Sequence, residues 1–198
     1  MIKAFLFDYG GVMTRSGKFG EMDDRLGSVL GIRPENAHKF LSPVWEKYIR
    51  GKIKEAELWS YIEAQSGQHI SVGKRDLWNI WETTQLLPQM TELVAELKRK
   101  GYPVGLLSNA IPNTVRERRE HNGYAGFDFL VLSCEVGYAK PDPEIYALAM
   151  EKFGGTLASE VVFLDDQERC LVPARELGMQ TILVKDPAQA ISEVRSLL

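Results

Sequence analysis

The chain has few cysteines and no long apolar run. Only two of its 198 residues are cysteines, which is too few for a disulfide framework in a chain of this length. No apolar stretch approaches the roughly 20 residues that cross a bilayer as a helix. The apolar residues 4–7 are too few for a signal peptide, and no small-residue cleavage site follows them. We therefore expect a soluble, reduced protein of the cytoplasm that does not contact membranes.

An excess of one charge sign is also missing. Charged residues make up 26% of the chain, and the formal net charge is −3 without any basic run. Nucleic-acid binding needs a basic surface that neutralises phosphates, so we expect no nucleic-acid partner. Arg116, Arg118 and Arg119 form only a small cluster, which we interpret as a solvated helix face. The three histidines lack the spacing of a metal site and receive no role.

Five short apolar runs predict buried parallel strands. They span residues 2–7, 102–107, 127–132, 161–164 and 181–184. Each run shows little alternation of polar and apolar residues, which is typical of strands covered on both faces. Amphipathic helices are predicted between them, as at 88–100 and 168–177. This alternation predicts a doubly wound α/β core, in which helices cover both faces of a parallel sheet.

A block of helices interrupts this pattern after the first strand. The helices are predicted at 21–30, 34–49, 54–65 and 72–84. The four tryptophans lie in this block, at Trp45, Trp59, Trp78 and Trp81. We interpret them as the apolar core of the block, in preference to a surface that stacks on a ligand. The domains predicted are an α/β core of residues 1–14 and 87–198 and a small helical cap of residues 15–86.

Polar side chains follow three of the predicted strands. Asp8 follows the first strand, Ser108 and Asn109 follow the second, and Asp165 and Asp166 follow the fourth. Ligands of open parallel sheets bind beyond the carboxyl ends of the strands, so these side chains should converge at one edge. Converging carboxylates repel one another unless a cation neutralises them, and oxygen ligands suit Mg²⁺. The sequence therefore predicts a magnesium site that includes Asp8 and Asp166.

A lysine precedes two prolines in the segment Ala139-Lys140-Pro141-Asp142-Pro143. Pro141 disfavours helix at Lys140, which places the lysine in an extended loop. Asp142 can cap a helix that begins with Pro143. A lysine held just before such a helix can direct its ammonium group at a fixed anion. The alternative is an ordinary solvated lysine of a loop.

Four motifs of the chain resemble those of the haloacid dehalogenase (HAD)-like hydrolase superfamily. They are Phe7-Asp8-Tyr9-Gly10-Gly11-Val12, Leu107-Ser108-Asn109, Gly137-Tyr138-Ala139-Lys140-Pro141 and Phe163-Leu164-Asp165-Asp166. Their order and spacing match over essentially the whole chain. Residues 161–184 most resemble the subgroup of the soluble epoxide hydrolase N-terminal phosphatase domain. The segment 48–53 resembles a turn that recurs in the caps of that group.

The resemblance implies a magnesium-dependent phosphatase that acts on a small phosphorylated metabolite. Asp8 would be the nucleophile and would form an aspartyl-phosphate, while Asp165 would orient Lys140 or a metal-bound water. The implied catalytic residues are Asp8, Lys140 and Asp165, the metal ligands are Asp8, Gly10 and Asp166, and the substrate-binding residues are Gly11, Ser108 and Asn109. Phosphoryl transfer depends on positioning and charge neutralisation, which these residues would supply.

Two positions depart from the pattern of the family. Gly10 replaces the aspartate that serves as general acid and base, and Cys170 replaces an asparagine of the last motif. Glycine cannot transfer a proton, and such transfer commonly contributes about 10²–10⁴ in rate. We interpret Cys170 as a small packed residue.

These departures leave two alternative functions. One is a dehalogenase-type carbon–halogen hydrolase, a class that also lacks the second aspartate and uses no metal. The other is a weakly active or inactive relative that binds a phosphorylated ligand. The sequence names no individual substrate, and it leaves open whether the protein is a monomer or a homodimer.

Overall fold

A five-stranded parallel sheet forms the centre of the structure. The computed structural model describes residues 1–15, 21–75 and 86–198. The sheet has the order β3-β2-β1-β4-β5. Its strands are β1 (Ala4–Phe7), β2 (Val104–Ser108), β3 (Phe129–Leu132), β4 (Val161–Asp165) and β5 (Gln180–Leu183). All five predicted strands are present, and the carboxyl end of each lies within one residue of its predicted position.

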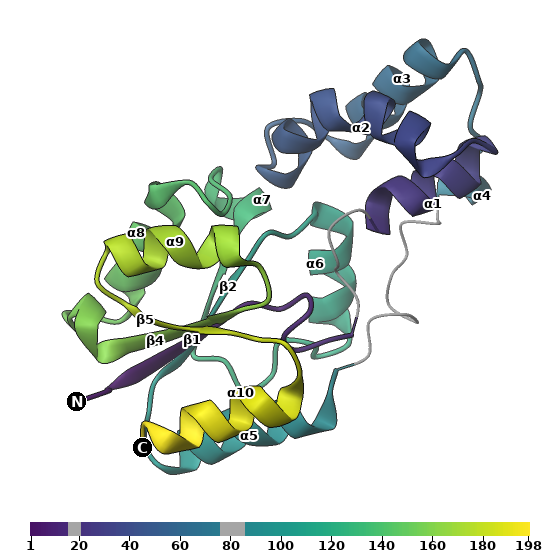
Figure 1. Ribbon diagram of the computed structural model, residues 1–198. Coiled ribbons are helices and arrows are strands. Elements are labelled where there is room, and N and C mark those ends of the chain that lie inside the picture. The colour runs from purple at the N-terminus through teal and green to yellow at the C-terminus, as the bar shows by residue number, and fades with distance from the viewer. Residues whose placement is uncertain (16–20, 76–85) are drawn as a thin grey trace.

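Helices cover both faces of the sheet, as the sequence predicts. They are α5 (Pro88–Arg99), α6 (Pro112–Glu120), α7 (Ser133–Val136), α8 (Pro143–Lys152), the 3₁₀ turn η3 (Ala158–Glu160), α9 (Glu168–Glu176) and α10 (Pro187–Ser196). Alternate residues of β1 point to opposite faces, so Phe5 packs in the core under α5 and α10, and Leu6 in the core under α8 and α9. Figure 1 shows these two helix pairs on either side of the sheet. The doubly wound α/β fold is confirmed.

Helices α1–α4 form a separate group, and α1, α2 and α3 enclose a second apolar core, to which Ile111 and Ala139 of the α/β part also contribute. They are α1 (Glu21–Leu30), α2 (Pro34–Ile49), α3 (Glu55–Ser66) and α4 (Val72–Arg75). Trp59 is buried in this core and Trp45 packs against it, as predicted. Trp78, Trp81 and the predicted helix beyond residue 75 lie outside the described residues. In the parts of the chain that are described, no helix is long and apolar enough to cross a membrane.

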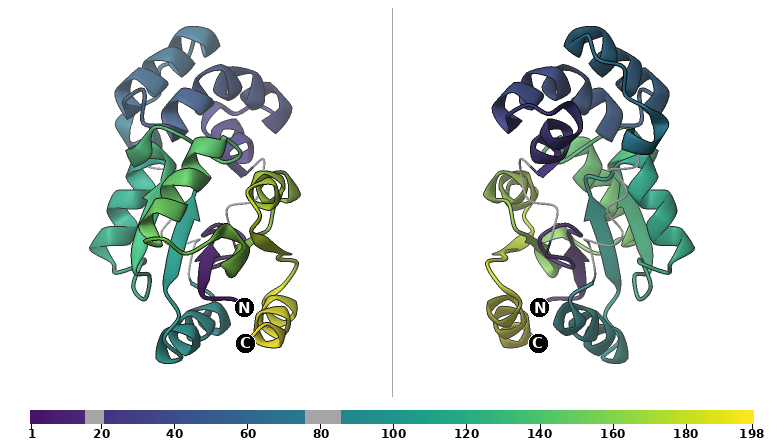
Figure 2. Two further views of the ribbon diagram at one scale, coloured as in Figure 1. Left: turned by 90° about the vertical axis from the view of Figure 1, so that its left-hand side faces the viewer. Right: turned by 90° about the vertical axis from the view of Figure 1, so that its right-hand side faces the viewer.

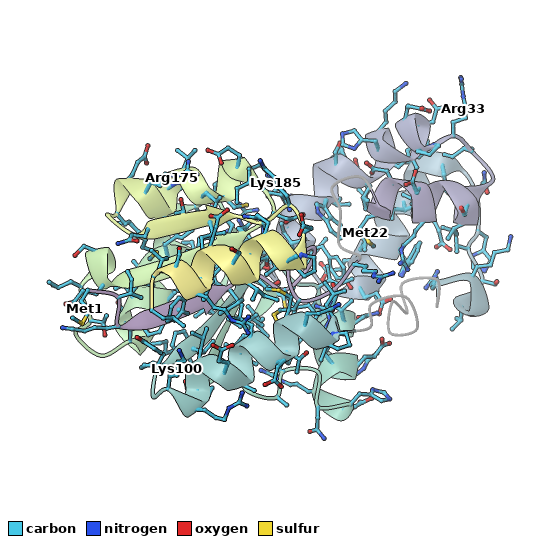
Figure 3. All side chains as sticks on the ribbon, turned by 60° about the horizontal axis from the view of Figure 1, so that its bottom comes forward. Met1, Met22, Arg33, Lys100, Arg175 and Lys185 are labelled. Carbon is cyan, nitrogen blue, oxygen red and sulfur yellow. The ribbon has the colours of Figure 1, made fainter. Side chains whose placement is uncertain are left out.

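The helical group lies at the end of the core that is far from both termini. Figures 1 and 2 show this arrangement, and in Figure 3 Arg33 marks the far tip of the group while Met1 lies at the opposite end of the molecule. Thr14 and Leu86 pair as an isolated antiparallel bridge where the chain leaves the core and returns to it. The bridge adjoins the predicted domain boundaries, which remain a prediction.

One arginine of the predicted solvated face is buried. Arg116 and Arg119 are exposed on α6, but Arg118 is only 8% exposed. Its guanidinium carbon lies 4.1 Å from the centroid of the Tyr9 ring, which is a cation–π contact on the residue that follows Asp8. The prediction of a fully solvated face is therefore wrong for Arg118. The reason is an aromatic partner from a distant segment, which the charge pattern of one helix cannot reveal.

Gly105 of β2 lies against the ring of Phe129 on the neighbouring strand. A Cβ atom at Gly105 would lie 2.3 Å from that ring. We expect Gly105→Ala to overpack the sheet and to lower the free energy of unfolding by about 1–3 kcal/mol in urea denaturation. The control is Gly73→Ala in α4, where a Cβ atom would meet none of the described residues within 4 Å. The control should be neutral or slightly stabilising, and equal losses in both variants would contradict the overpacking.

Candidate active site

Four charged side chains from three segments meet at the carboxyl ends of β1 and β4. Asp8 follows β1, and Asp165 and Asp166 lie at the end of β4. One carboxylate oxygen from each aspartate lies within 4.8 Å of the others. Lys140 reaches them from the turn before α8, with Nζ 2.8 Å from Asp8 Oδ1 and 2.6 Å from Asp165 Oδ2. The parallel pairing of β1 with β4 explains why residues so far apart in the sequence converge.

Lys140 is buried, with an exposed fraction of only 3%. Burial alone would lower the pKa of the lysine, but the carboxylates of Asp165 and Asp8 outweigh burial and raise it. The ammonium group therefore stays charged in this environment. The alternative of a solvated loop lysine is wrong, because the turn directs the side chain inward onto the two carboxylates.

Asp165 holds Lys140 from the interior of the protein. Its Oδ2 accepts a hydrogen bond from Lys140 Nζ, and its Oδ1 accepts one from the backbone N–H of Gln167 at 2.8 Å. Burial raises the pKa of Asp165 to about 7, with a further contribution from Asp8, although Lys140 opposes the shift. Both carboxylate oxygens therefore have partners in the protein. These contacts suit a residue that orients a lysine.

Asp166 has a buried carboxylate oxygen without a partner. Its Oδ1 makes no hydrogen bond in the described structure, and burial, followed by the charge of Asp8, raises the pKa of Asp166. Three carboxylates face the single ammonium of Lys140, so the ionised cluster carries a surplus of negative charge. A hard cation would neutralise this surplus and would satisfy the orphan oxygen. The residues present therefore fit Mg²⁺. Asp8 and Asp166 remain its predicted carboxylate ligands, because both oxygens of Asp165 have partners in the protein.

Gly11 leaves the space that Asp166 occupies. It has φ of +76°, and a Cβ atom there would lie 2.3 Å from Asp166 Oδ2. Any larger residue would strain the backbone and displace the carboxylate. Of the two adjacent glycines, only Gly11 has a left-handed φ; Gly10 does not. The expected roles of Gly10 at the metal and Gly11 at the substrate remain predictions.

Ser108 and Asn109 lie next to the Lys140 turn at the end of β2. Ser108 is buried, with 3% of its surface exposed. The side-chain amide of Asn109 binds the main chain of Lys140 at both atoms. Nδ2 donates to Lys140 O at 2.8 Å, and Lys140 N donates to Oδ1 at 2.7 Å. This support of the lysine was not expected from the sequence, and the contact of Asn109 with a phosphoryl group remains a prediction.

Asp142 stands at the N-cap of α8 with Pro143 after it, as predicted, but its side chain does not cap the helix. Its carboxylate binds the guanidinium group of Arg50, at the end of α2, and the backbone N–H of Ala139. The predicted capping role is therefore wrong. A charged partner from the helical group outcompetes the amides of the helix start, and local sequence does not reveal that partner.

Cys170 is a packed residue, as expected. Its side chain is 1% exposed, and burial raises the pKa of its thiol to about 12. A thiol with so high a pKa is not a nucleophile near neutral pH. The hydroxyl group of Tyr146 donates to the Cys170 carbonyl at 2.6 Å, which ties α8 to α9 beneath the site.

The chain belongs to the haloacid dehalogenase-like hydrolases, whose family model matches residues 2–178. It is 40% identical over 115 residues to bifunctional epoxide hydrolase 2 of Sus scrofa. That match covers 53% of this chain and only a fifth (20%) of the length of that protein. It is 28% identical to the sesquiterpene phosphatase astK of Aspergillus oryzae, over 99% of this chain and 96% of that protein. The predicted superfamily is confirmed.

A solved structure of a HAD family enzyme from Bacteroides thetaiotaomicron has the same fold. It superposes with a TM-score of 0.76 at 26% identity, covering 93% of this chain and 95% of that one. That enzyme was crystallised with magnesium and inorganic phosphate.

Mg²⁺ should raise the melting temperature of the protein, and more so at about pH 8 than at about pH 6. The raised pKa values of Asp165 and Asp166 mean that lowering the pH protonates the cluster, and Mg²⁺ must displace those protons to bind. Affinity should therefore rise with pH, with a stabilisation of about 2.7 kcal/mol when Mg²⁺ is present at 100 times its Kd. Thermal denaturation at both pH values, with and without Mg²⁺, measures the effect.

Two aspartate variants control the magnesium experiment. Asp166→Asn should remove most of the Mg²⁺-dependent shift. Asp186→Asn should keep it, because Asp186 caps α10 and is not among the clustered carboxylates. An equal shift in the parent and in Asp166→Asn would show that Asp166 is not a ligand.

Proposed function

We propose that the protein is a magnesium-dependent phosphomonoesterase that hydrolyses a small phosphorylated metabolite through an aspartyl-phosphate on Asp8. One observation carries the proposal: the buried Asp8 is paired with the buried ammonium of Lys140, and a carboxylate oxygen of Asp8 lies within 4.8 Å of one from Asp166. Mg²⁺ held by Asp8, the carbonyl of Gly10 and Asp166 would neutralise charge on the phosphoryl oxygens.

The proposed reaction has two chemical steps, in which the residues of the site have different roles. In the first step an Asp8 oxygen bonds to phosphorus, and the phosphorus–oxygen bond to the leaving group breaks with its electron pair on the ester oxygen. Lys140 neutralises negative charge on Asp8 and on the phosphoryl group, while Ser108, Asn109 and Gly11 bind the phosphoryl oxygens. In the second step a water oxygen bonds to the same phosphorus, and the bond from phosphorus to the Asp8 oxygen breaks with its electron pair on the carboxylate. Inorganic phosphate leaves, and the proton that water gives up balances the alkoxide formed in the first step.

The relatives favour this reaction over carbon–halogen hydrolysis. A relative that matches almost the entire chain is a sesquiterpene phosphatase, and a neighbour in fold binds magnesium with phosphate. We further propose that residues 1–14 and 87–198 form the catalytic core, that residues 15–86 form a cap that selects the metabolite, and that the protein acts in the cytoplasm. The apolar cluster around α1, α2 and α3 supports the division into a core and a cap.

Asp8→Asn should reduce hydrolysis of p-nitrophenyl phosphate to background. Asparagine keeps the size of aspartate but is a far weaker nucleophile. The readouts are turnover with Mg²⁺ and, in the parent protein, mass spectrometry of a phosphoryl group on Asp8. The control is Asp186→Asn, which should turn over like the parent. Undiminished turnover in Asp8→Asn would refute the nucleophile, and halide release from a 2-haloacid in the presence of chelator would support the carbon–halogen alternative.

Gly10 should make the reaction sensitive to the leaving group. Without a general acid at this position, nitrophenyl phosphates should turn over measurably and alkyl phosphates slowly, because an alkoxide leaves poorly without a proton. Gly10→Asp should restore a proton donor and speed the alkyl substrates, since its backbone does not have the left-handed φ that disfavours a side chain. A plot of log kcat/KM against leaving-group pKa should be steep in the parent and flatter in the variant.

The neighbouring glycine provides the control for this experiment. Gly11→Asp should not rescue alkyl substrates, because its φ of +76° and the contact with Asp166 exclude a side chain there. Equal slopes for the parent and a well-folded Gly10→Asp would mean that the proton comes from another group.

A further inference from the structure

The turn at the end of α2 contacts the core at helix α7 and at the N-terminus of α8. Ser133 Oγ donates to the carbonyl of Ile49 at 2.6 Å. Gly51 fits so closely that a Cβ atom there would lie 2.1 Å from the Cys134 carbonyl oxygen. Between these two contacts, Arg50 reaches Asp142. The backbone of the turn 49–51 therefore packs directly against the core. Arg50 is the charged side chain of this turn.

Arg50 binds Asp142 through two nitrogens. Nε lies 3.0 Å from Oδ2, and Nη2 lies 3.1 Å from Oδ1. The Arg50 side chain is 16% exposed and that of Asp142 is 31% exposed, so the pair is partly shielded from water. Glu46, one turn earlier in α2, also binds Arg50 and holds the guanidinium group in place. Planar, two-point pairing of this kind determines orientation as well as distance.

Asp142 transmits this contact to the Lys140 turn. Its Oδ2 accepts the backbone N–H of Ala139 at 3.1 Å, and its own N–H donates to the Ala139 carbonyl at 2.7 Å. Ala139 is fully buried and packs within the apolar core of the helical group. From the other side, Asn109 holds both backbone groups of Lys140. The main chain that aims Lys140 is thus held between a core residue and the helical group.

We propose that Arg50 is a positioning residue, which the helical group supplies to hold the Lys140 turn in the geometry that places its ammonium on Asp8. The catalytic consequence rests on the proposed phosphatase function, whereas the structural coupling does not. Arg50 would act through Asp142 and Ala139 without touching the substrate. Without Arg50, the helical group would no longer hold the main chain of the Lys140 turn.

Arg50→Ala tests the coupling, and Arg75→Ala is its matched control. Arg75 also pairs with a partly buried carboxylate, Glu63 at 2.8 Å, but both of these residues lie within the helical group. Arg50→Ala should lower kcat for p-nitrophenyl phosphate by about 10²-fold with a smaller change in KM, because displacing a charged group by about 1 Å has an effect of that size. Arg75→Ala should keep the kcat of the parent, even if its melting temperature falls by as much as that of Arg50→Ala. Arg50→Lys, which keeps the charge but loses the planar pair, should lie between Arg50→Ala and the parent.

Hydrogen exchange of the segment 137–142 gives a readout that is independent of turnover. Its amides should exchange faster in Arg50→Ala than in the parent or in Arg75→Ala, while the amides of β1 and β4 should not change. If Arg50→Ala does not fold, Asp142→Asn should show the same faster exchange and lower kcat, because it removes the charge that Arg50 binds.

The outcomes separate this inference from the proposed function. Unchanged exchange in the segment 137–142, or faster exchange with unchanged kcat, would overturn the positioning role. An equal fall of kcat in Arg75→Ala would also overturn it, since general destabilisation would then explain the loss. If the parent hydrolyses no phosphate ester with Mg²⁺, the proposed function fails, and hydrogen exchange alone decides the coupling.

Discussion

The candidate site depends on one buried ammonium group, that of Lys140 between Asp8 and Asp165. Removing three charges from water is costly, and their mutual attraction offsets the cost only when the geometry is good and the remaining oxygens find partners. Asp165 meets that condition through the amide of Gln167, whereas a buried oxygen of Asp166 has no hydrogen-bond partner among the described residues. Lysine therefore neutralises only part of the cluster. The same surplus of negative charge that would destabilise the metal-free fold makes the site suited to a divalent cation.

Most of this arrangement could be predicted from the sequence, because the fold leaves few choices for it. A parallel sheet places the residues after its strands at one edge, and apolar runs mark where strands end. The predicted carboxyl ends were accurate to one residue. The predicted starts of β1, β2 and β3 were two residues too early, because the apolar pattern begins before the strand pairing does. The shared carboxyl edge of parallel strands was enough to bring Asp8 and Asp165 together without coordinates, although the sequence predicted neither the strand order nor the register. The Lys140 turn could be assigned as non-helical from Pro141, but not the burial of its side chain.

The contacts that sequence reasoning missed all join segments that are distant in the chain. Arg118 lies over Tyr9, Asn109 binds the main chain of Lys140, and Asp142 prefers Arg50 to its own helix. Rules based on local sequence predict contacts between a side chain and its neighbours in the chain, such as the amides at the start of a helix. They cannot predict a contact with a guanidinium group of the helical group, because the position of that group depends on how two apolar cores pack. The residues that support the site are for this reason harder to predict than the residues that form it.

Gly10 cannot donate a proton to the leaving group, and the other residues of the cluster are poorly placed to do so in its stead. Lys140 has a raised pKa and is held by two carboxylates, so giving up a proton would leave both carboxylates unpaired in the interior. Asp165 is protonated near pH 7 more readily than an ordinary aspartate, but its oxygens face Lys140 and the Gln167 amide. For the proposed reaction, the proton of the leaving group must then come from water or from the helical group. The contact of Arg50 with Asp142 would thereby join the support of Lys140 to the part of the protein that could supply this proton.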